Sequence, residues 1–246
     1  MNLRPAVDER TRIKICGLTR EQDVDAAVAA GADAVGFVQY EASPRYVPPA
    51  RAAELARRLP PFVTPVLLFV NAEPQAVEAA CDLLPTAWLQ FHGDESPAQC
   101  LAASGGGARP YLRAARIPLD EGQSFDLLKF ASDYSQARAI LLDAHVEGYG
   151  GGGKAFNWSL LPPSVGSHLV LSGGLTPANV TDGILQVRPR CKTLAVDVSS
   201  GVEADGPDGS PLKGIKDAGK IHRFIAAVRA ADAQLAKNPH EFLSAT

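Results

Sequence analysis

The chain repeats one pattern eight times: a short apolar segment is followed by an alanine-rich or amphipathic segment. Short segments with alternating or continuous hydrophobicity are typical of strands, and the longer amphipathic ones are typical of helices. Strands that alternate with helices predict a parallel sheet, and eight such units predict a single closed (β/α)8 barrel. An open doubly wound sheet is the alternative, but no GxGxxG motif follows the first strand. The expected strands cover residues 12–16, 33–38, 65–70, 87–91, 109–114, 138–142, 168–171 and 193–198.

The length and composition fit one barrel domain. The chain has 246 residues, of which 46% are hydrophobic, and this is enough for a sizeable core. We place the barrel at residues 12–230, with an N-terminal tail at 1–11 and a C-terminal tail at 231–246. A long polar loop at about 204–215 leads into the expected last helix at about 215–230, which the following residues can continue for a turn or two.

Charge and cysteine usage exclude several classes of protein. The net charge of −3 provides no basic field for nucleic acid or for an anionic membrane. The four cysteines are isolated and show neither metal-finger nor CxxC spacing, so we expect no metal site and a reducing, cytoplasmic location. No apolar run approaches the roughly 18 residues of a membrane-spanning helix. The first ten residues have no apolar core, so we expect no signal peptide.

The first expected strand ends on a cysteine where α/β barrels carry their chemistry. In residues 12–16, two isoleucines alternate with Lys14 and Cys16, which therefore point to the opposite face. Gly17 ends the strand, and Thr19 can cap the helix that follows. The carboxyl ends of the strands form the active-site face of a barrel. We therefore expect Cys16 to face the site.

Polar residues follow most of the other strands and should gather at the same edge. These residues are Arg45, Asn71, His92, Asp143, Ser172-Gly173-Gly174 and Ser199-Ser200-Gly201. The last two segments follow strands seven and eight, where many barrels bind phosphate. Glycines let backbone N–H groups approach an anion, and a helix starting at Thr176-Pro177 would add partial positive charge. One Gly-Gly turn is ordinarily only a tight turn, but two at adjacent strands favour phosphate binding.

Cys16 and Asp143 are the candidate acid–base pair, because the ends of strands one and six should face each other across the barrel mouth. A thiol is a general base only as thiolate, so a cation or oriented N–H groups must lower its pKa. A general acid needs a raised pKa, from burial or from the charge of the substrate. Taken singly, the cysteine is typical of a small buried hydrophobe and the aspartate of a turn residue.

Three further side chains have an expected place near this pair. Lys14 should lie inside the barrel, one layer deeper than the cysteine, and Asp197 on the adjacent eighth strand is its expected carboxylate partner. We interpret this pair as structural support. Arg45 matches a substrate carboxylate, although its position fits a solvated loop arginine equally well. His92 is a site-lining or core histidine rather than a metal ligand, because no second histidine lies at ligand spacing.

Several segments, taken in order, carry a family resemblance. They are Lys14-Ile15-Cys16-Gly17-Leu18-Thr19, Gly36-Phe37, Ser43-Pro44-Arg45-Tyr46, Val70-Asn71, Leu89-Gln90-Phe91-His92-Gly93, Leu142-Asp143-Ala144, residues 151–158, Leu171-Ser172-Gly173-Gly174-Leu175, residues 196–203, and Lys216-Asp217 with Lys220-Ile221. This ordered set resembles the phosphoribosylanthranilate isomerase family, from about residue 12 to residue 230. The fold of that family is a (β/α)8 barrel.

The resemblance implies an Amadori rearrangement in tryptophan biosynthesis, in which N-(5-phosphoribosyl)anthranilate becomes 1-(2-carboxyphenylamino)-1-deoxyribulose 5-phosphate. It implies that Asp143 is the general acid that opens the furanose ring, and that Cys16 is the general base that removes the C2′ proton. Arg45 would hold the anthranilate carboxylate, and the backbone around Gly173-Gly174 and Ser200-Gly201 would hold the phosphate. No metal or organic cofactor is implied, because the imine itself is the electron sink.

Two other functions remain as alternatives. One is a neighbouring phosphosugar isomerase, such as the Amadori isomerase of histidine biosynthesis, which looks to use two aspartates where this chain has Cys16 and Asp143. The other is a barrel that binds a phosphate ligand without turnover. The glycines at 150–153 are consistent with a loop that closes over substrate. We expect a monomer or a homodimer with a small-molecule substrate.

Overall fold

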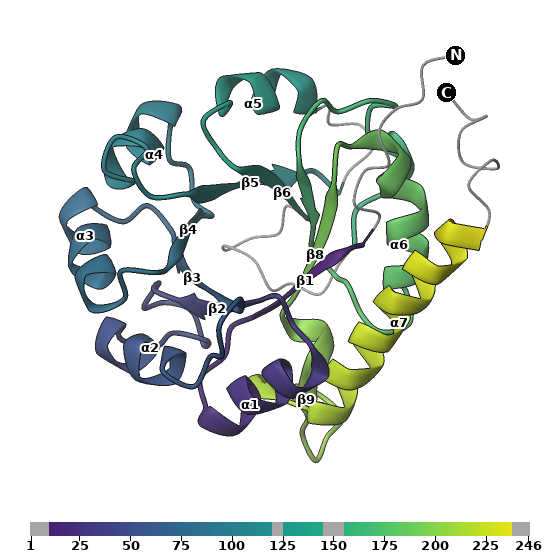
Figure 1. The fold of residues 1–246 in the computed structure, drawn as a ribbon, viewed down its shortest axis with the longest axis horizontal. Helices are drawn as coiled ribbons and strands as arrows, with labels where there is room; N and C mark the ends of the chain where they lie inside the picture. The colour runs from purple at the N-terminus through teal and green to yellow at the C-terminus, as the bar shows by residue number, and fades with distance from the viewer. Residues whose placement is uncertain (1–9, 120–124, 145–154, 238–246) are drawn as a thin grey trace.

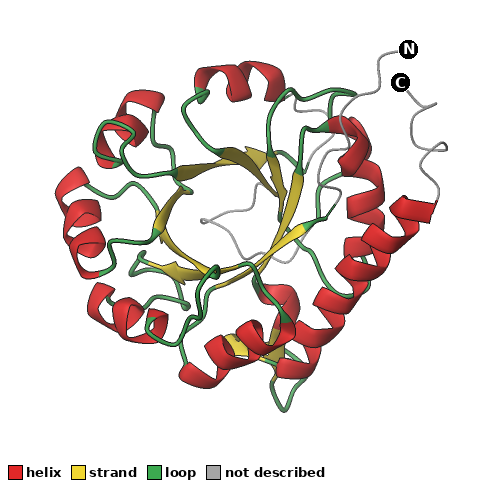
Figure 2. Cartoon of the chain, in the orientation of Figure 1, coloured by secondary structure: helices red, strands yellow, loops and turns green. Residues whose placement is uncertain are grey.

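The computed structural model describes residues 10–119, 125–144 and 155–237. Eight parallel strands close into a barrel in sequence order, so the predicted barrel is confirmed and the open sheet is excluded. Figure 1 looks down this barrel, and Figure 2 shows the ring of helices around it. The strands are β1 (Arg12–Cys16), β2 (Ala34–Val38), β3 (Thr64–Phe69), β4 (Trp88–Phe91), β5 (Tyr111–Ile117), β6 (Ala139–Ala144), β7 (Leu169–Leu171) and β8 (Leu194–Val198).

Helices follow most strands and pack against the outside of the barrel. The α-helices are α1 (Glu21–Ala30), α2 (Pro49–Ala56), α3 (Pro74–Leu83), α4 (Pro97–Ala103), α5 (Leu127–Asp133), α6 (Val180–Val187) and α7 (Ala218–Lys237), and the short 3₁₀ helices are η1 (Trp158–Leu160), η2 (Arg188–Arg190) and η3 (Ser200–Val202). Proline opens α2, α3 and α4, where the first turn does not need its N–H. Gly31 ends α1 with a φ of 94°. Within the described ranges, no helix is both long enough and apolar enough to cross a membrane.

Side chains alternate between the helix-covered outside of the barrel and its interior. Ile13 and Ile15 belong to the large core between strands and helices, whereas Cys16 packs inside the barrel with Val38 and Leu68. A second interior cluster gathers small and aliphatic residues of β5, β6 and β7. The alternation predicted for the first strand therefore decides which of its side chains reach the site.

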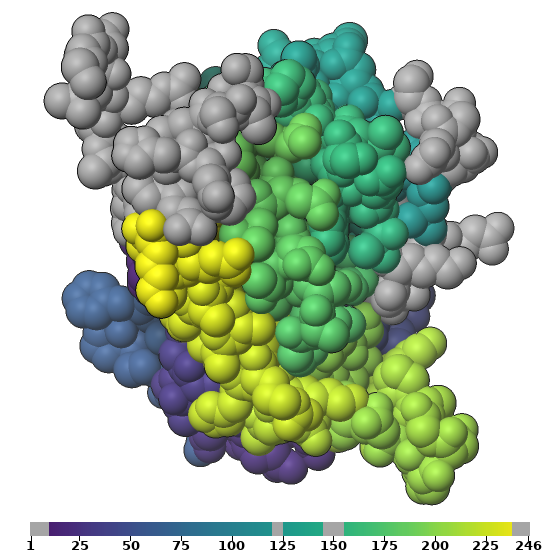
Figure 3. All heavy atoms as spheres, turned by 90° about the vertical axis from the view of Figure 1, so that its right-hand side faces the viewer, coloured from purple at the N-terminus to yellow at the C-terminus, as the bar shows by residue number. Residues whose placement is uncertain are grey.

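The segment after β8 differs from the prediction. The expected polar loop at 204–215 contains an antiparallel hairpin of β9 (Glu203–Asp205) and β10 (Pro211–Lys216). The last helix, α7, starts at Ala218 rather than near 215, and it continues to Lys237. Residues 231–237 therefore extend this helix, as the sequence allowed, and Ala231 is buried against the core. In Figure 3 the yellow helix α7 crosses one flank beside α6, and the yellow-green hairpin projects at its lower end.

Candidate active site

Cys16 lies at the carboxyl end of β1, in space that Gly36 leaves open. Its side chain is buried inside the barrel. A Cβ atom at Gly36 on β2 would lie 2.6 Å from the Cys16 Sγ and 3.1 Å from the Lys14 Cε, so only glycine leaves room for both side chains. Gly17 turns the chain with a φ of 73°, and a Cβ there would lie 2.7 Å from the Arg45 Cδ.

Lys14 and Asp197 form the ion pair expected inside the barrel. The two residues are register partners on β1 and β8, and the Lys14 Nζ lies 2.9 Å from the Asp197 Oδ1. Burial acts to lower the pKa of Lys14, but Asp197 and Cys16 outweigh it and hold the pKa above its usual value. Burial raises the pKa of the Cys16 thiol; the charge of Lys14 acts against this shift and that of Asp197 adds to it. The thiol is therefore protonated at neutral pH in the free protein.

Asp143 is buried on β6 and is held by His92, which directly follows β4. The His92 Nε2 lies 2.9 Å from the Asp143 Oδ2, and the backbone N–H of Ala144 donates to the Asp143 Oδ1 over 3.0 Å. The other ring nitrogen, Nδ1, lies 2.9 Å from the Nε2 of Gln90. The predicted site-lining histidine thus contacts the candidate acid directly, and Gln90, which strand alternation places on the same face, is its second partner.

A buried cluster fixes the turn that follows His92. The carboxylate of Glu95 accepts from the backbone N–H of Asn71 over 2.7 Å and from that of Gly93 over 2.9 Å, and it pairs with Arg113 at 3.3 Å. The guanidinium of Arg113 also donates to the carbonyl oxygens of Phe91 and Gly93. Asn71, expected at the strand ends, therefore supports the β4 turn.

Arg45 is buried rather than solvated, so the solvated-loop interpretation is wrong. Its Nε and Nη2 donate to the two carboxylate oxygens of Glu203 over 2.7 and 2.9 Å, a bidentate pair. The backbone N–H of Gly214 donates to the same carboxylate over 2.9 Å. Lys216 approaches it to 3.4 Å and donates to the carbonyl oxygen of Ser199 over 2.9 Å. The hairpin β9–β10 thus closes on the loop that carries Arg45.

This cluster places two cations on one carboxylate. Burial raises the pKa of Glu203, but the hydrogen bond from Arg45 and the charge of Lys216 outweigh it and lower the pKa overall. Burial lowers the pKa of Lys216 to about 8; Glu203 opposes this shift and Arg45 adds to it. At neutral pH most Lys216 side chains are still charged. The cluster therefore carries one positive charge in excess.

The two glycine turns lie against each other and against Asp143. Gly173 and Gly174 have φ values of 76° and 64°, and their N–H groups donate to none of the residues that the structure describes. A Cβ at Gly173 would lie 2.9 Å from the Asp143 Oδ1, and one at Gly201 would overlap the carbonyl oxygen of Leu175. The turns after β7 and β8 are therefore in direct contact.

The helix expected at Thr176-Pro177 begins later. Residues 176–179 form a turn, and α6 starts at Val180. The Asn179 side chain accepts from the Thr176 N–H over 2.8 Å and donates to the Gly174 carbonyl, so it stabilises this turn. The Val180 N–H donates to the Thr176 carbonyl over 3.2 Å, which is helical spacing, so the regular helix begins a few residues later than predicted.

Comparison with known proteins identifies the family. Residues 13–227 match the family model described as N-(5'phosphoribosyl)anthranilate (PRA) isomerase. The chain belongs to the N-(5'-phosphoribosyl)anthranilate isomerase family. A relative of that name from Methylibium petroleiphilum is 64% identical over 227 residues, which cover 92% of this chain and 98% of the relative. One from Leptothrix cholodnii is 64% identical over 234 residues, which cover 95% and 96%.

Solved structures of phosphoribosyl anthranilate isomerases share the fold. The enzyme from Thermotoga maritima is 39% identical with a TM-score of 0.75, over 89% of this chain and 99% of that chain. A further structure, 36% identical with a TM-score of 0.72 and the same coverage, is a complex with reduced 1-(o-carboxyphenylamino)-1-deoxyribulose 5-phosphate. The predicted family is confirmed. The protein is an isomerase of the aldose–ketose, intramolecular oxidoreductase type that belongs to tryptophan biosynthesis.

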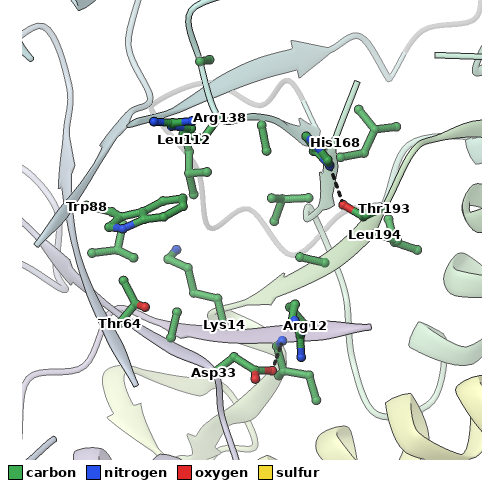
Figure 4. A pocket seen from close by; sticks show the side chains of 18 of the residues that line it. Arg12, Lys14, Asp33, Thr64, Trp88, Leu112, Arg138, His168, Thr193 and Leu194 are labelled. Carbon is green, nitrogen blue, oxygen red and sulfur yellow. Dashed lines mark hydrogen bonds between the residues drawn. The ribbon is translucent and has the colours of Figure 1, made fainter. Parts of the chain in front are cut away.

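In this isomerase a cavity opens at the opposite end of the barrel. It has a volume of about 810 Å³ and is lined by the amino ends of the strands. Figure 4 shows Trp88, Arg138, His168 and Thr193 around it, with Lys14 reaching in from β1. The side chains of Cys16, His92 and Asp143 are not part of its lining. The cavity therefore lies apart from the candidate acid–base pair.

Two site features of the isomerase need separate mention. The glycines at 150–153 lie outside the described residues. Among the residues that are described, no three histidine, cysteine, aspartate or glutamate side chains come together as a metal site. Sequence reasoning did not identify Glu203 and Lys216 as partners of Arg45. The only local signal that they are buried is that each directly follows an apolar residue, Val202 and Ile215 respectively.

Proposed function

We propose that the protein converts N-(5-phosphoribosyl)anthranilate into 1-(2-carboxyphenylamino)-1-deoxyribulose 5-phosphate, with Asp143 as general acid and Cys16 as general base. The observation that carries this proposal is the arrangement at the strand ends. Asp143 is buried and is hydrogen-bonded to His92. Cys16 is buried beside a surplus positive charge. Both residues lie toward the carboxyl ends of their strands, at the same face of the barrel. Family membership supplies the substrate.

Asp143 is suited to proton donation because both of its oxygens have donors. His92 and the Ala144 N–H stabilise the carboxylate that remains after the proton leaves. The proton passes to the ring oxygen of the ribose, and the ring opens to a Schiff base. A positioned acid of this kind typically contributes about 10²–10⁴-fold to the rate.

Cys16 removes the C2′ proton of that Schiff base, and the resulting enolamine tautomerises to the keto product. The base must be the thiolate, whose formation burial opposes. The positive charges of Lys14 and Lys216 lower the pKa of the thiol against this burial. The iminium charge of the substrate acts in the same direction, so the thiolate forms once substrate is bound. The ion pair of Lys14 with Asp197 lies deeper in the barrel than Cys16 and holds the charge of Lys14 next to the thiol.

The surplus positive charge beside Cys16 suits the anthranilate carboxylate. Arg45 and Lys216 share only Glu203, and the Nη1 of Arg45 donates to none of the described residues. This nitrogen lies on a guanidinium that Glu203 already holds in place. A second carboxylate at Arg45 would neutralise the cluster. Arg45 therefore binds the substrate carboxylate, with Glu203 fixing its orientation.

The glycine turns after β7 and β8 bind the phosphate. The N–H groups of Gly173 and Gly174, which donate to no residue in the described part of the chain, form an anion-binding surface. Ser199, Ser200 and Gly201 lie in the adjoining turn. No helix N-terminus is required, because backbone N–H groups alone can satisfy phosphate oxygens. The absence of any cofactor requirement, the cytoplasmic location and the monomeric or homodimeric state stay predictions.

The test is the loss of phosphoribosylanthranilate fluorescence, with the substrate generated in situ and purified full-length protein added. We expect rapid loss with the native protein and at least a 100-fold slower loss with Asp143→Asn, since a general acid contributes about that much or more. Asp182→Asn, on the surface helix α6, is the matched control and should retain the native rate. Folding of each variant is checked by circular dichroism. No loss with folded native protein would overturn the reaction; native-like turnover by Asp143→Asn would overturn the role of the acid.

A further inference from the structure

We propose that Gln90 is a positioning residue that fixes the tautomer of His92 and thereby places the transferable proton of Asp143 on its Oδ1. The inference rests on the proposed function of Asp143 as the general acid. It goes beyond that function because the hydrogen bond of Gln90 reaches His92 and not the acid, so Gln90 acts through His92.

Gln90 sits inside the barrel with few possible partners. It is fully buried on β4, two residues before His92 and therefore on the same face of the strand. Its register neighbours are Leu68 on β3 and Leu112 on β5, which are interior apolar residues. Among the described residues, its Nε2 faces the His92 Nδ1 at 2.9 Å, and its Oε1 is buried without a hydrogen-bond partner. A polar side chain with no other partner inside an apolar layer points to a role at the histidine.

The chemistry of the amide decides the state of the imidazole. An amide nitrogen only donates, so the Nδ1 that it faces must accept and carries no proton. The neutral ring then has its proton on Nε2, and this N–H points at the Asp143 Oδ2 over 2.9 Å. The histidine thus acts as a fixed donor to one oxygen of the acid.

The hydrogen on Asp143 then favours the other oxygen. Oδ2 accepts from the His92 imidazole over 2.9 Å, and Oδ1 accepts from the adjacent Ala144 backbone N–H over 3.0 Å. A protonated Asp143 keeps the imidazole hydrogen bond when it carries its hydrogen on Oδ1. That oxygen lies beside Gly173, where even a Cβ atom would approach to 2.9 Å. The absence of a side chain at this glycine leaves the Oδ1 side open. The proton therefore points toward the glycine turn that binds phosphate, on the side where the ribose must lie.

Loss of the Gln90 amide removes the preference for the His92 tautomer that is protonated on Nε2. When the Gln90 amide is absent, the buried Nδ1 of His92 has no hydrogen-bond donor. The tautomer with the proton on Nδ1 is then favoured, and Nε2 becomes an acceptor. An accepting Nε2 draws the Asp143 proton onto Oδ2 and away from the ribose. The acid is present in such a variant but aimed wrongly, so kcat should fall by about 10–100-fold, below the full general-acid contribution, with little change in KM.

The test reads the tautomer directly by ¹⁵N NMR of the full chain with labelled histidine. The chain has five histidines, and the spectrum of a His92→Gln variant assigns the His92 signals. We expect native His92 at neutral pH to carry its proton on Nε2. Gln90→Met, which keeps the length of the side chain without a donor, should shift it toward the Nδ1 form, and Gln90→Glu, which offers an acceptor to Nδ1, should shift it further.

Gln39→Met is the matched control. Gln39 also has a buried Oε1 without a described partner, but its Nε2 donates to the Val47 carbonyl, not to a histidine. It should leave the His92 tautomer unchanged. A native His92 protonated on Nδ1, or a Gln90→Met variant with native tautomer and native kcat, would overturn the proposal. Because the spectrum needs no turnover, an inactive native protein with the Nε2 tautomer would count against the proposed function and not against the positioning role.

Discussion

The two ends of the barrel differ in the burial and pairing of the charged side chains that they carry. At the carboxyl ends, buried charges are paired: Arg45 with Glu203, and Asp143 with a histidine that is itself held by Gln90. At the amino ends, Arg138 is exposed around an open cavity, and Phe62 nearby is fully exposed. Burial makes an unpaired charge costly, so the buried charges have partners, whereas exposed Arg138 needs none.

The comparison also separates geometry from chemistry. A cavity lies at the amino ends, and the candidate acid and base are not in its lining. Barrel enzymes keep their catalytic groups at the carboxyl ends because the loops there converge from every strand. In this protein the buried hydrogen-bond networks lie at the carboxyl ends, with the candidate acid and base.

The largest effect should come from the base. Cys16→Ala removes the thiol and should lower kcat by about 10²–10⁴-fold, the range of a positioned general base, while the fold is kept. Cys81→Ala is the matched control, because Cys81 is equally buried but belongs to the outer core on α3. Steady-state assays of both variants decide the matter. Near-native turnover by Cys16→Ala would remove it from the mechanism.

The next effect should come from breaking a buried pair at the carboxyl ends. Glu203→Gln leaves Arg45 and Lys216 buried without a carboxylate, and removal of one partner of such a pair costs about 3–5 kcal/mol of unfolding free energy. KM should rise as well, since Arg45 loses the partner that orients it. Urea denaturation and substrate titration measure the two effects. Glu21→Gln, whose ion pair with Arg51 is solvent-exposed, should show neither; equal behaviour of the two variants would erase the contrast between buried and exposed pairs.

A smaller effect should depend on pH. Burial lowers the pKa of Lys216 to about 8, whereas an unfolded lysine titrates near 10.4. Between these values the unfolded chain binds more protons than the folded one, so this group makes the unfolding free energy rise with pH. The stability of the native protein relative to Lys216→Met should therefore increase from pH 8 to pH 10 in denaturation experiments. Lys213→Met, exposed on the same strand β10, should show a constant difference, and a constant difference for Lys216→Met would contradict the lowered pKa.

The smallest effect should come from the amino ends. Arg138 is exposed at the rim of the cavity, so Arg138→Ala should change the unfolding free energy by no more than about 0.5 kcal/mol. We also expect kcat within about twofold of the native value, because the side chain is remote from the general acid–base groups. Thermal denaturation and the fluorescence assay test both. A loss of activity comparable to that of Glu203→Gln would mean that the two ends of the barrel are coupled.

Local pattern determined the barrel and much of its interior. Alternation over residues 12–16 separates the isoleucines from Lys14 and Cys16, and the order of strands makes Asp197 a neighbour of Lys14, as found at 2.9 Å. These features depend only on the period of a strand and on the adjacency of the first and eighth strands in a closed barrel. For the same reason most strand positions could be predicted to within a residue or two.

Tertiary structure alone decided the partners of the site residues. Arg45 meets Glu203 across 158 positions of sequence and His92 meets Asp143 across 51, and no periodicity connects either pair. The turn at 176–179 and the hairpin after β8 were likewise decided by side-chain and cross-strand hydrogen bonds. Local sequence determines which way a side chain points, because that follows from backbone geometry. Which group it meets, and how its pKa moves, depends on the distances and burial that arise only when the barrel closes.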